Sequence, residues 1–89
     1  MNIAGKTVLV TGGARRVGAE LVRAFASAGA EIRLHVRHSR AEADELIASL
    51  PHPELCRVVS ADLAVPGEAA KLFASCGKVD ILVNNASMF

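Results

Sequence analysis

The chain has 89 residues, of which 52% are hydrophobic and 21% charged, and its formal net charge is +1. A chain this short forms one small domain at most, and its near-neutral charge excludes a general electrostatic attraction to nucleic acid or acidic membranes. No apolar run approaches the ~20 residues of a membrane span, and the first residues lack a signal-peptide core, so we expect a cytoplasmic protein. We expect Cys56 and Cys76 to be reduced, structural thiols, and we expect no metal site.

The beginning of the chain carries its most informative pattern. A β-branched, apolar run at residues 7–10 predicts a buried parallel strand, and Thr-Gly-Gly-Ala-Arg-Arg-Val-Gly follows directly at 11–18. Apolar residues then recur at helical spacing from Val17 until Gly29, which predicts a helix over 17–28. A strand, a glycine turn and a helix in this order hold the pyrophosphate of a dinucleotide. Gly12 would leave no Cβ between backbone and phosphate, and the N–H groups of the first helical turn would face the anion.

The remainder continues to alternate between strands and helices. Residues 31–36 alternate in polarity and predict a second strand, with Ile32, Leu34 and Val36 on one face and Arg33 and His35 on the other. Further elements are expected at 40–50 (helix), 55–60 (strand), 66–76 (helix) and 79–83 (strand). We therefore predict one α/β unit over residues 1–89, a partial Rossmann fold with a parallel sheet in strand order 3-2-1-4 and three right-handed crossover helices.

Two details support the expected boundaries of the second helix. Ser39 and Glu42 have the spacing of a capping box, which predicts that the helix begins at residue 40. Pro51 and Pro53 would stop the helix after residue 50, since proline cannot continue it.

Charge at the end of the second predicted strand distinguishes the two nicotinamide cofactors. An NAD site needs a carboxylate ~20 residues beyond the loop to bind the ribose 2′-hydroxyl, whereas an NADP site needs cations for the 2′-phosphate. The chain has no acid between residues 31 and 42, and it places His35, Arg37, His38 and Ser39 there. NADP(H) is therefore predicted, with Arg37 as the leading phosphate contact because a guanidinium can bind phosphate through two bonds. A basic loop that only faces water is the alternative.

Three motifs, each at the carboxyl end of a predicted strand, resemble those of the short-chain dehydrogenase/reductase family. They are Thr11-Gly12 with Gly18, Asp62-Leu63, and Asn84-Asn85-Ala86-Ser87. Within the family, the Arg15-Arg16 pair, residues 34–39 and the ending at 82–89 are most similar to the pteridine reductase branch.

This chain departs from the family patterns at two places. Arg16 stands where the common family pattern has a second glycine; in pteridine-reductase-like members an arginine here helps to hold the cofactor phosphates, and a solvated arginine is the alternative. Arg37 precedes His38, whereas similar reductases have the histidine first, which leaves open which of the two contacts the 2′-phosphate.

The resemblance implies further roles. Asp62 would accept a hydrogen bond from adenine beside the Leu63 backbone, although a turn or helix-start role suits this aspartate as well. Ser87 and Phe89 would contact a pterin substrate, Phe89 by stacking, whereas Asn84 is better interpreted as a link between strands. The complete predicted set of cofactor contacts is Gly12, Arg15, Arg16, Val17, Gly18, His35, Arg37, His38, Ser39, Asp62, Leu63, Asn85, Ala86 and Ser87.

The catalytic Tyr-x-x-x-Lys pair of the family is missing, because the sequence contains no tyrosine. We therefore expect no catalytic residue and no activity from these 89 residues alone, which resemble the NADPH-binding half of a pteridine (dihydropteridine or dihydrofolate) reductase-like oxidoreductase. The alternatives are a short-chain reductase of another carbonyl substrate and a non-catalytic NADP(H)-binding module. A P-loop NTPase is disfavoured because Val17-Gly18-Ala19 offers neither the lysine nor the hydroxyl of that loop.

The fourth strand carries an expectation about assembly. In the family this strand has a further neighbour, so its outer edge would present unpaired backbone groups beside apolar side chains. We expect self-association through residues 81–83, and the resemblance implies a homotetramer for the full-length family.

Overall fold

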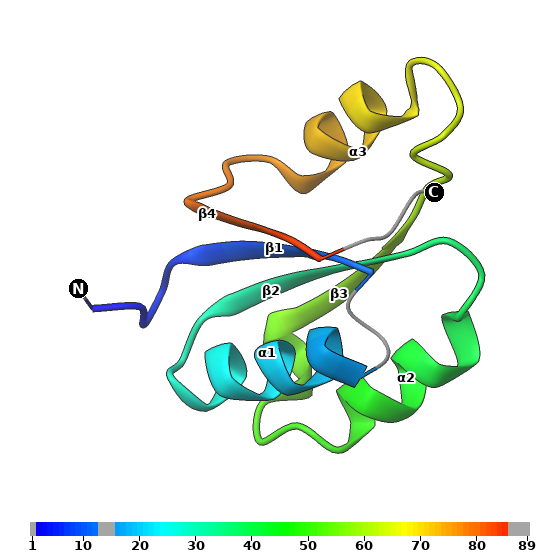
Figure 1. Ribbon diagram of the computed structural model, residues 1–89. Helices are drawn as coiled ribbons and strands as arrows, with labels where there is room; N and C mark the ends of the chain where they lie inside the picture. Colours follow the sequence, from blue (N-terminus) through cyan, green and yellow to red (C-terminus); the bar gives the residue numbers. More distant parts are fainter. Residues whose placement is uncertain (1, 13–15, 86–89) are drawn as a thin grey trace.

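A four-stranded parallel sheet lies at the centre of the molecule and carries helices on both faces (Figure 1). The computed structural model describes residues 2–12 and 16–85. The elements are β1 (Thr7–Thr11), α1 (Arg16–Ser27), β2 (Glu31–Val36), α2 (Arg40–Ala48), the 3-10 turn η1 (Pro53–Leu55), β3 (Cys56–Ser60), α3 (Glu68–Cys76) and β4 (Ile81–Asn84). The strand order β3-β2-β1-β4, with every pair parallel, confirms the predicted Rossmann arrangement.

The direction of the chain through the sheet explains where the helices lie. From β1 to β3 the strands advance toward one edge, so α1 and α2 cover the same face, as Figure 1 shows. The chain then returns to the other side of β1, and α3 covers the opposite face. The strand order thus reverses between β1 and β4, and open α/β sheets bind their ligands at the carboxyl end of such a reversal.

The core has two parts that meet at β1. Val8, Leu9 and Val10 have no exposed surface, which confirms the predicted buried strand. Val8 and Val10 belong to the larger cluster under α1 and α2, together with Ile32, Leu34 and Val36 of β2. Leu9 belongs to the smaller cluster under α3, with Leu72 and Cys76. The central strand is therefore held from both faces, and the turn that follows it starts from a fixed position.

A reciprocal pair of hydrogen bonds fastens the start of β1 to the approach to β4. The Asp80 N–H donates to the Thr7 carbonyl at 2.9 Å, and the Asp80 carboxylate accepts the Thr7 N–H at 2.9 Å. This Thr7 N–H is the main reason that the pKa of the Asp80 carboxyl lies below its ordinary value; burial opposes the shift, and Lys78 and Lys6 add to it. The pair fixes β4 beside β1 although the two lie far apart in sequence.

Several predicted boundaries were wrong by a few residues, for local reasons. The helix predicted over 40–50 ends at Ala48, where the Ser49 hydroxyl donates to the Leu46 carbonyl at 2.6 Å and closes the last turn. The predicted capping box is not formed by Ser39, whose side chain makes no capping bond. The helix predicted from residue 66 begins at Glu68, because Gly67 precedes it in the left-handed conformation with φ of 87°. The η1 turn moves the start of β3 to Cys56.

The other ends are closer to expectation. β1 extends to Thr11, β4 begins at Ile81 instead of residue 79, and β2 has the predicted bounds. α1 ends at Ser27, and Gly29 follows in the left-handed conformation with φ of 87°, as expected of a residue that ends a helix.

Candidate dinucleotide site

The turn after β1 is held to the end of β4 by side chains of both strands. The Thr11 hydroxyl accepts the Asn85 N–H at 2.9 Å and donates to the Asn84 side-chain carbonyl at 3.1 Å. The Asn85 amide in turn donates to the Gly12 carbonyl at 3.2 Å. Asn84 therefore links two strands, as predicted, and the Asn85 side chain holds the Gly12 carbonyl. Thr11 was not among the predicted site residues, although a hydroxyl at the carboxyl end of a buried strand is the signal that could have indicated it.

Gly12 has a backbone φ of 62°, a conformation that side chains disfavour. Its carbonyl is bound by Asn85, and its N–H donates to the ring nitrogen Nδ1 of His35 at 3.1 Å. Both peptide groups of Gly12 are therefore used inside the protein. Any backbone donors for a diphosphate would have to come from later in the loop and from the first turn of α1.

His35 lies on the predicted face of its strand but is buried, which the sequence did not indicate. Its side chain lies on the face of β2 opposite Leu34, as predicted, and only 3% of the residue is exposed. The second ring nitrogen, Nε2, lies 2.9 Å from the Ala61 carbonyl, beyond the end of β3. Both ring nitrogens are bonded to backbone groups, which gives His35 a role inside the protein, and its predicted cofactor contact stays a prediction.

Arg37 and Asp62 face each other across the ends of β2 and β3. Their closest nitrogen and oxygen atoms are 3.3 Å apart, and the side chains are 59% and 33% exposed. The other Asp62 oxygen accepts the Ala64 N–H at 3.0 Å, which confirms the turn role of this aspartate. Its adenine contact stays a prediction. Neighbouring His38 is exposed and Ser39 is half-buried, so both Arg37 and His38 face outward.

The charge of the first turn of α1 favours an anion. It contains no acidic residue, and Arg16 and Val17 are exposed at its start, with Val17 64% exposed. Gly18 is buried and lies on the packed side of the helix. Because a helix N-terminus carries partial positive charge, the absence of a carboxylate here leaves that charge for a ligand.

The remaining predicted contacts divide into two groups. Leu63 packs its side chain against the smaller core cluster, so a cofactor contact would come from its backbone. Arg15, Ala86, Ser87 and Phe89 lie outside the described residues, and their predicted roles stay predictions.

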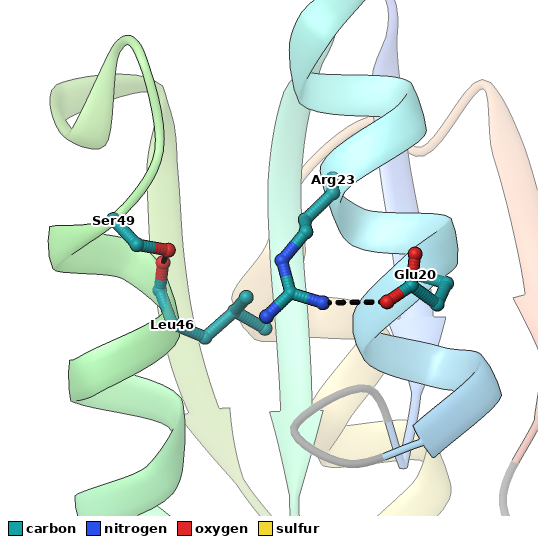
Figure 2. Close-up of polar contacts among 4 residues, drawn as sticks. All are labelled: Glu20, Arg23, Leu46 and Ser49. Carbon is teal, nitrogen blue, oxygen red and sulfur yellow. Dashed lines mark hydrogen bonds and ion pairs between the residues drawn. The ribbon is translucent and has the colours of Figure 1, made fainter.

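Other possible sites were weaker. In residues 2–12 and 16–85 no group of histidine, cysteine, aspartate and glutamate could hold a metal ion, and no helix there is long and apolar enough to cross a membrane. A shallow groove between α1 and α2 is lined by Arg23, Glu42, Glu45, Leu46 and Ser49. Figure 2 shows Leu46 pointing toward the Arg23 guanidinium, which is already paired with Glu20 at 2.8 Å. This groove is formed by the outer helices and not by the carboxyl ends of the strands, so we do not assign it to the dinucleotide.

Comparison with known proteins agrees with this geometry. The family model described as short chain dehydrogenase matches residues 6–89. The chain belongs to the short-chain dehydrogenase family.

Several members of this family are similar to the chain over nearly its whole length. An L-xylulose reductase from Mesocricetus auratus is 35% identical over 88 residues, which are 99% of this chain and 34% of the relative. FolM alternative dihydrofolate reductase 1 from Brucella canis, solved with NADP, superimposes with a TM-score of 0.81 at 35% identity, covering 99% of this chain and 37% of that one. The RhlG/NADP complex from Pseudomonas aeruginosa gives a TM-score of 0.83 at 34% identity, covering 97% of this chain and 35% of that one. The chain thus spans about a third of the length of these relatives.

Proposed function

We propose that this chain is the NADP(H)-binding part of a short-chain reductase of the pteridine-reductase-like kind. The observation that carries the cofactor assignment is the outward-facing, cationic end of β2. Arg37 and His38 are both exposed there, and the stretch contains no acid that could bind a ribose 2′-hydroxyl. Two family members that are similar in structure were solved with NADP, which supports the same cofactor for this chain.

The residues present fit such a cofactor. The N–H and the carbonyl of Gly12 are both bonded inside the protein, so Gly12 itself is held without a ligand. The acid-free first turn of α1, with Arg16 at its start, would receive the diphosphate, and Arg37 would receive the 2′-phosphate. Asp62 holds Arg37 at this place and would meet the adenine beside it. The cofactor would supply the hydride when bound, and the described residues bind and orient it.

Arg37 provides a direct test of the cofactor assignment. We expect Arg37→Ala to weaken NADPH binding by about tenfold or more, since a charge-assisted hydrogen bond contributes ~1.5–3 kcal/mol, and to leave NADH binding nearly unchanged. Arg40→Ala is a matched control: it removes the same charge three residues away, where Arg40 pairs with Asp44 and is 60% exposed. Titration calorimetry with both cofactors gives the two affinities. Equal losses of NADPH and NADH affinity in Arg37→Ala contradict the assignment.

The pterin substrate is the finer part of the proposal. Its support is the Arg15-Arg16 pair, residues 34–39, the ending with Ser87 and Phe89, and the similarity to a dihydrofolate reductase of the family. The similar identity to an L-xylulose reductase keeps another carbonyl substrate as the second candidate. A non-catalytic NADP(H)-binding module is the third.

Binding measurements on the NADP⁺-loaded chain separate these candidates. We expect dihydrofolate to bind and L-xylulose not to bind, with dihydrofolate affinity reduced in Phe89→Ala because the stacked ring is lost. Preferential binding of the sugar favours the second candidate, and binding of neither favours the third. With no tyrosine in its sequence, the 89-residue chain is expected to bind NADPH without oxidising it.

A further inference from the structure

The buried ring of His35 joins the two loops that the proposed function places against the cofactor. It accepts the Gly12 N–H at 3.1 Å on one side and lies 2.9 Å from the Ala61 carbonyl on the other. We propose that His35 is the positioning residue of the dinucleotide site, fixing the Gly12 turn relative to the Ala61–Asp62 segment as a neutral imidazole protonated on Nε2. This inference rests on the proposed function for its link to NADP(H), but the geometry it assigns can be measured without any ligand.

The two bonds determine the protonation state of the ring. A backbone N–H can only donate, so Nδ1 must carry a lone pair to receive Gly12. A carbonyl can only accept, so Nε2 must carry a proton and donate a hydrogen bond to the Ala61 carbonyl. The other neutral tautomer would set N–H against N–H at Gly12 and a lone pair against the carbonyl at Ala61. A doubly protonated ring would still satisfy Ala61 but would leave the Gly12 N–H facing another donor.

Each loop is held by a second contact besides the ring. Asn85 binds the Gly12 carbonyl, so the turn is held at both its N–H and its carbonyl. The Ala61 N–H donates to the Val36 carbonyl at 3.1 Å, and the next residue, Asp62, holds Arg37. The ring therefore connects the turn near the expected diphosphate with the ion pair near the expected adenosine. A buried hydrophobic side chain at this position could fill the space but could connect neither.

Two substitutions separate the two bonds. In His35→Asn, the side-chain carbonyl is as many bonds from Cα as Nδ1 and can still accept the Gly12 N–H, but the residue no longer reaches Ala61. His35→Phe keeps a ring and removes both bonds. His52→Phe is the matched control, since this histidine lies on the exposed loop before β3, 64% exposed and 3.5 Å from Glu54.

The first measurement uses nitrogen NMR on the free chain. We expect the His35 ring to show the Nε2-protonated tautomer and a coupling across the hydrogen bond between the Gly12 nitrogen and Nδ1. We expect the same coupling after NADPH is added, because the Gly12 N–H stays with the ring and does not move to a phosphate. An Nδ1-protonated ring, or loss of the coupling when NADPH binds, overturns the inference.

The second measurement is NADPH affinity. We expect about a tenfold loss in His35→Phe, an intermediate loss in His35→Asn, and no change in His52→Phe, since an unpaired buried N–H is costly and only the Asn variant keeps its acceptor. Equal affinity in all variants overturns the positioning role. If the unmodified chain binds no NADPH, the proposed function fails, whereas the ring tautomer and the Gly12 coupling still decide whether His35 fixes the turn. These two NMR results come from the unmodified chain and do not depend on the variants folding.

Discussion

Arg16 stands at the start of α1 with a backbone φ of 51°, in the left-handed region that favours glycine. A residue with a Cβ loses ~1–2 kcal/mol in this conformation. Replacing Arg16 with glycine would remove this strain and add ~0.5–1 kcal/mol of conformational entropy to the unfolded chain. The difference predicts that Arg16→Gly leaves stability unchanged or raises it by up to about 1.5 kcal/mol.

Arg23→Gly is the matched control in the same helix. Arg23 is an exposed arginine in the interior of α1, where glycine costs about 1 kcal/mol, and its pair with Glu20 adds ~0.3–0.5 kcal/mol. Urea unfolding of the unmodified chain and both variants gives the comparison. Destabilisation of Arg16→Gly by as much as Arg23→Gly would refute the backbone argument.

The same variant tests the function of Arg16. If its guanidinium binds the cofactor phosphates, Arg16→Gly lowers NADPH affinity by about tenfold while stability is kept or improved, since a charge-assisted bond contributes ~1.5–3 kcal/mol. A gain in stability together with a loss of affinity would show that the arginine is kept at a strained position for binding. An unchanged affinity would leave the side chain without a role in the site.

Three further outcomes follow from other parts of the molecule. Burial raises the pKa of the Cys56 thiol to about 11, although the charge of Arg33 opposes this shift. We therefore expect maleimide at pH 8 to label Cys56 far more slowly in the folded chain than in urea. Equal labelling rates would contradict this. The pKa of Asp80 is lower in the folded chain than in the unfolded chain. Its carboxylate therefore stabilises the fold at pH values above the unfolded pKa of about 3.9, and this stabilisation is lost as the pH falls through the folded pKa. Urea midpoints between pH 6 and 3 should therefore fall more steeply for the unmodified chain than for Asp80→Asn, and parallel curves would contradict the assignment. Leu82 on β4 is 49% exposed, and we propose that the chain self-associates there. Light scattering should show a mass that rises with protein concentration and that Leu82→Lys lowers. A monomer at all concentrations would refute this proposal.

The strands and their order were predictable because the apolar pattern of a parallel sheet is strong. Residues 31–36 alternate so regularly that the bounds of β2 were predicted to the residue. Helix ends were less predictable because several conformations compete for the same polar side chains. Ser39 had the sequence of a cap, but it makes no capping bond. Pro66 suits the first turn of a helix, yet Gly67 adopts the left-handed conformation and delays α3 to Glu68.

The place of the motifs that form the candidate site was predictable, but their contacts within the protein were only partly so. Motifs at the ends of β1, β3 and β4 come together because parallel strands share one carboxyl edge. For His35, the alternation correctly indicated the face opposite Leu34, but not that the residue is buried. Its ring bonds the Gly12 N–H and the Ala61 carbonyl, 23 and 26 residues away, and local sequence does not express such long-range contacts. The left-handed conformation of Arg16 was not predicted either, although the glycine that the common family pattern has at this position was a signal for it.

The polar residues at this edge divide by direction, and the division suggests how affinity and selectivity are separated. Thr11, His35 and Asn85 point inward and use their hydrogen bonds to hold the turn at Gly12. Arg16 and Arg37 are exposed and carry the charges that a cofactor phosphate would meet. Loss of an inward residue should therefore weaken NADH and NADPH alike, because both require the same turn. Loss of Arg37 should change the ratio between the two cofactors, because only one of them carries the 2′-phosphate.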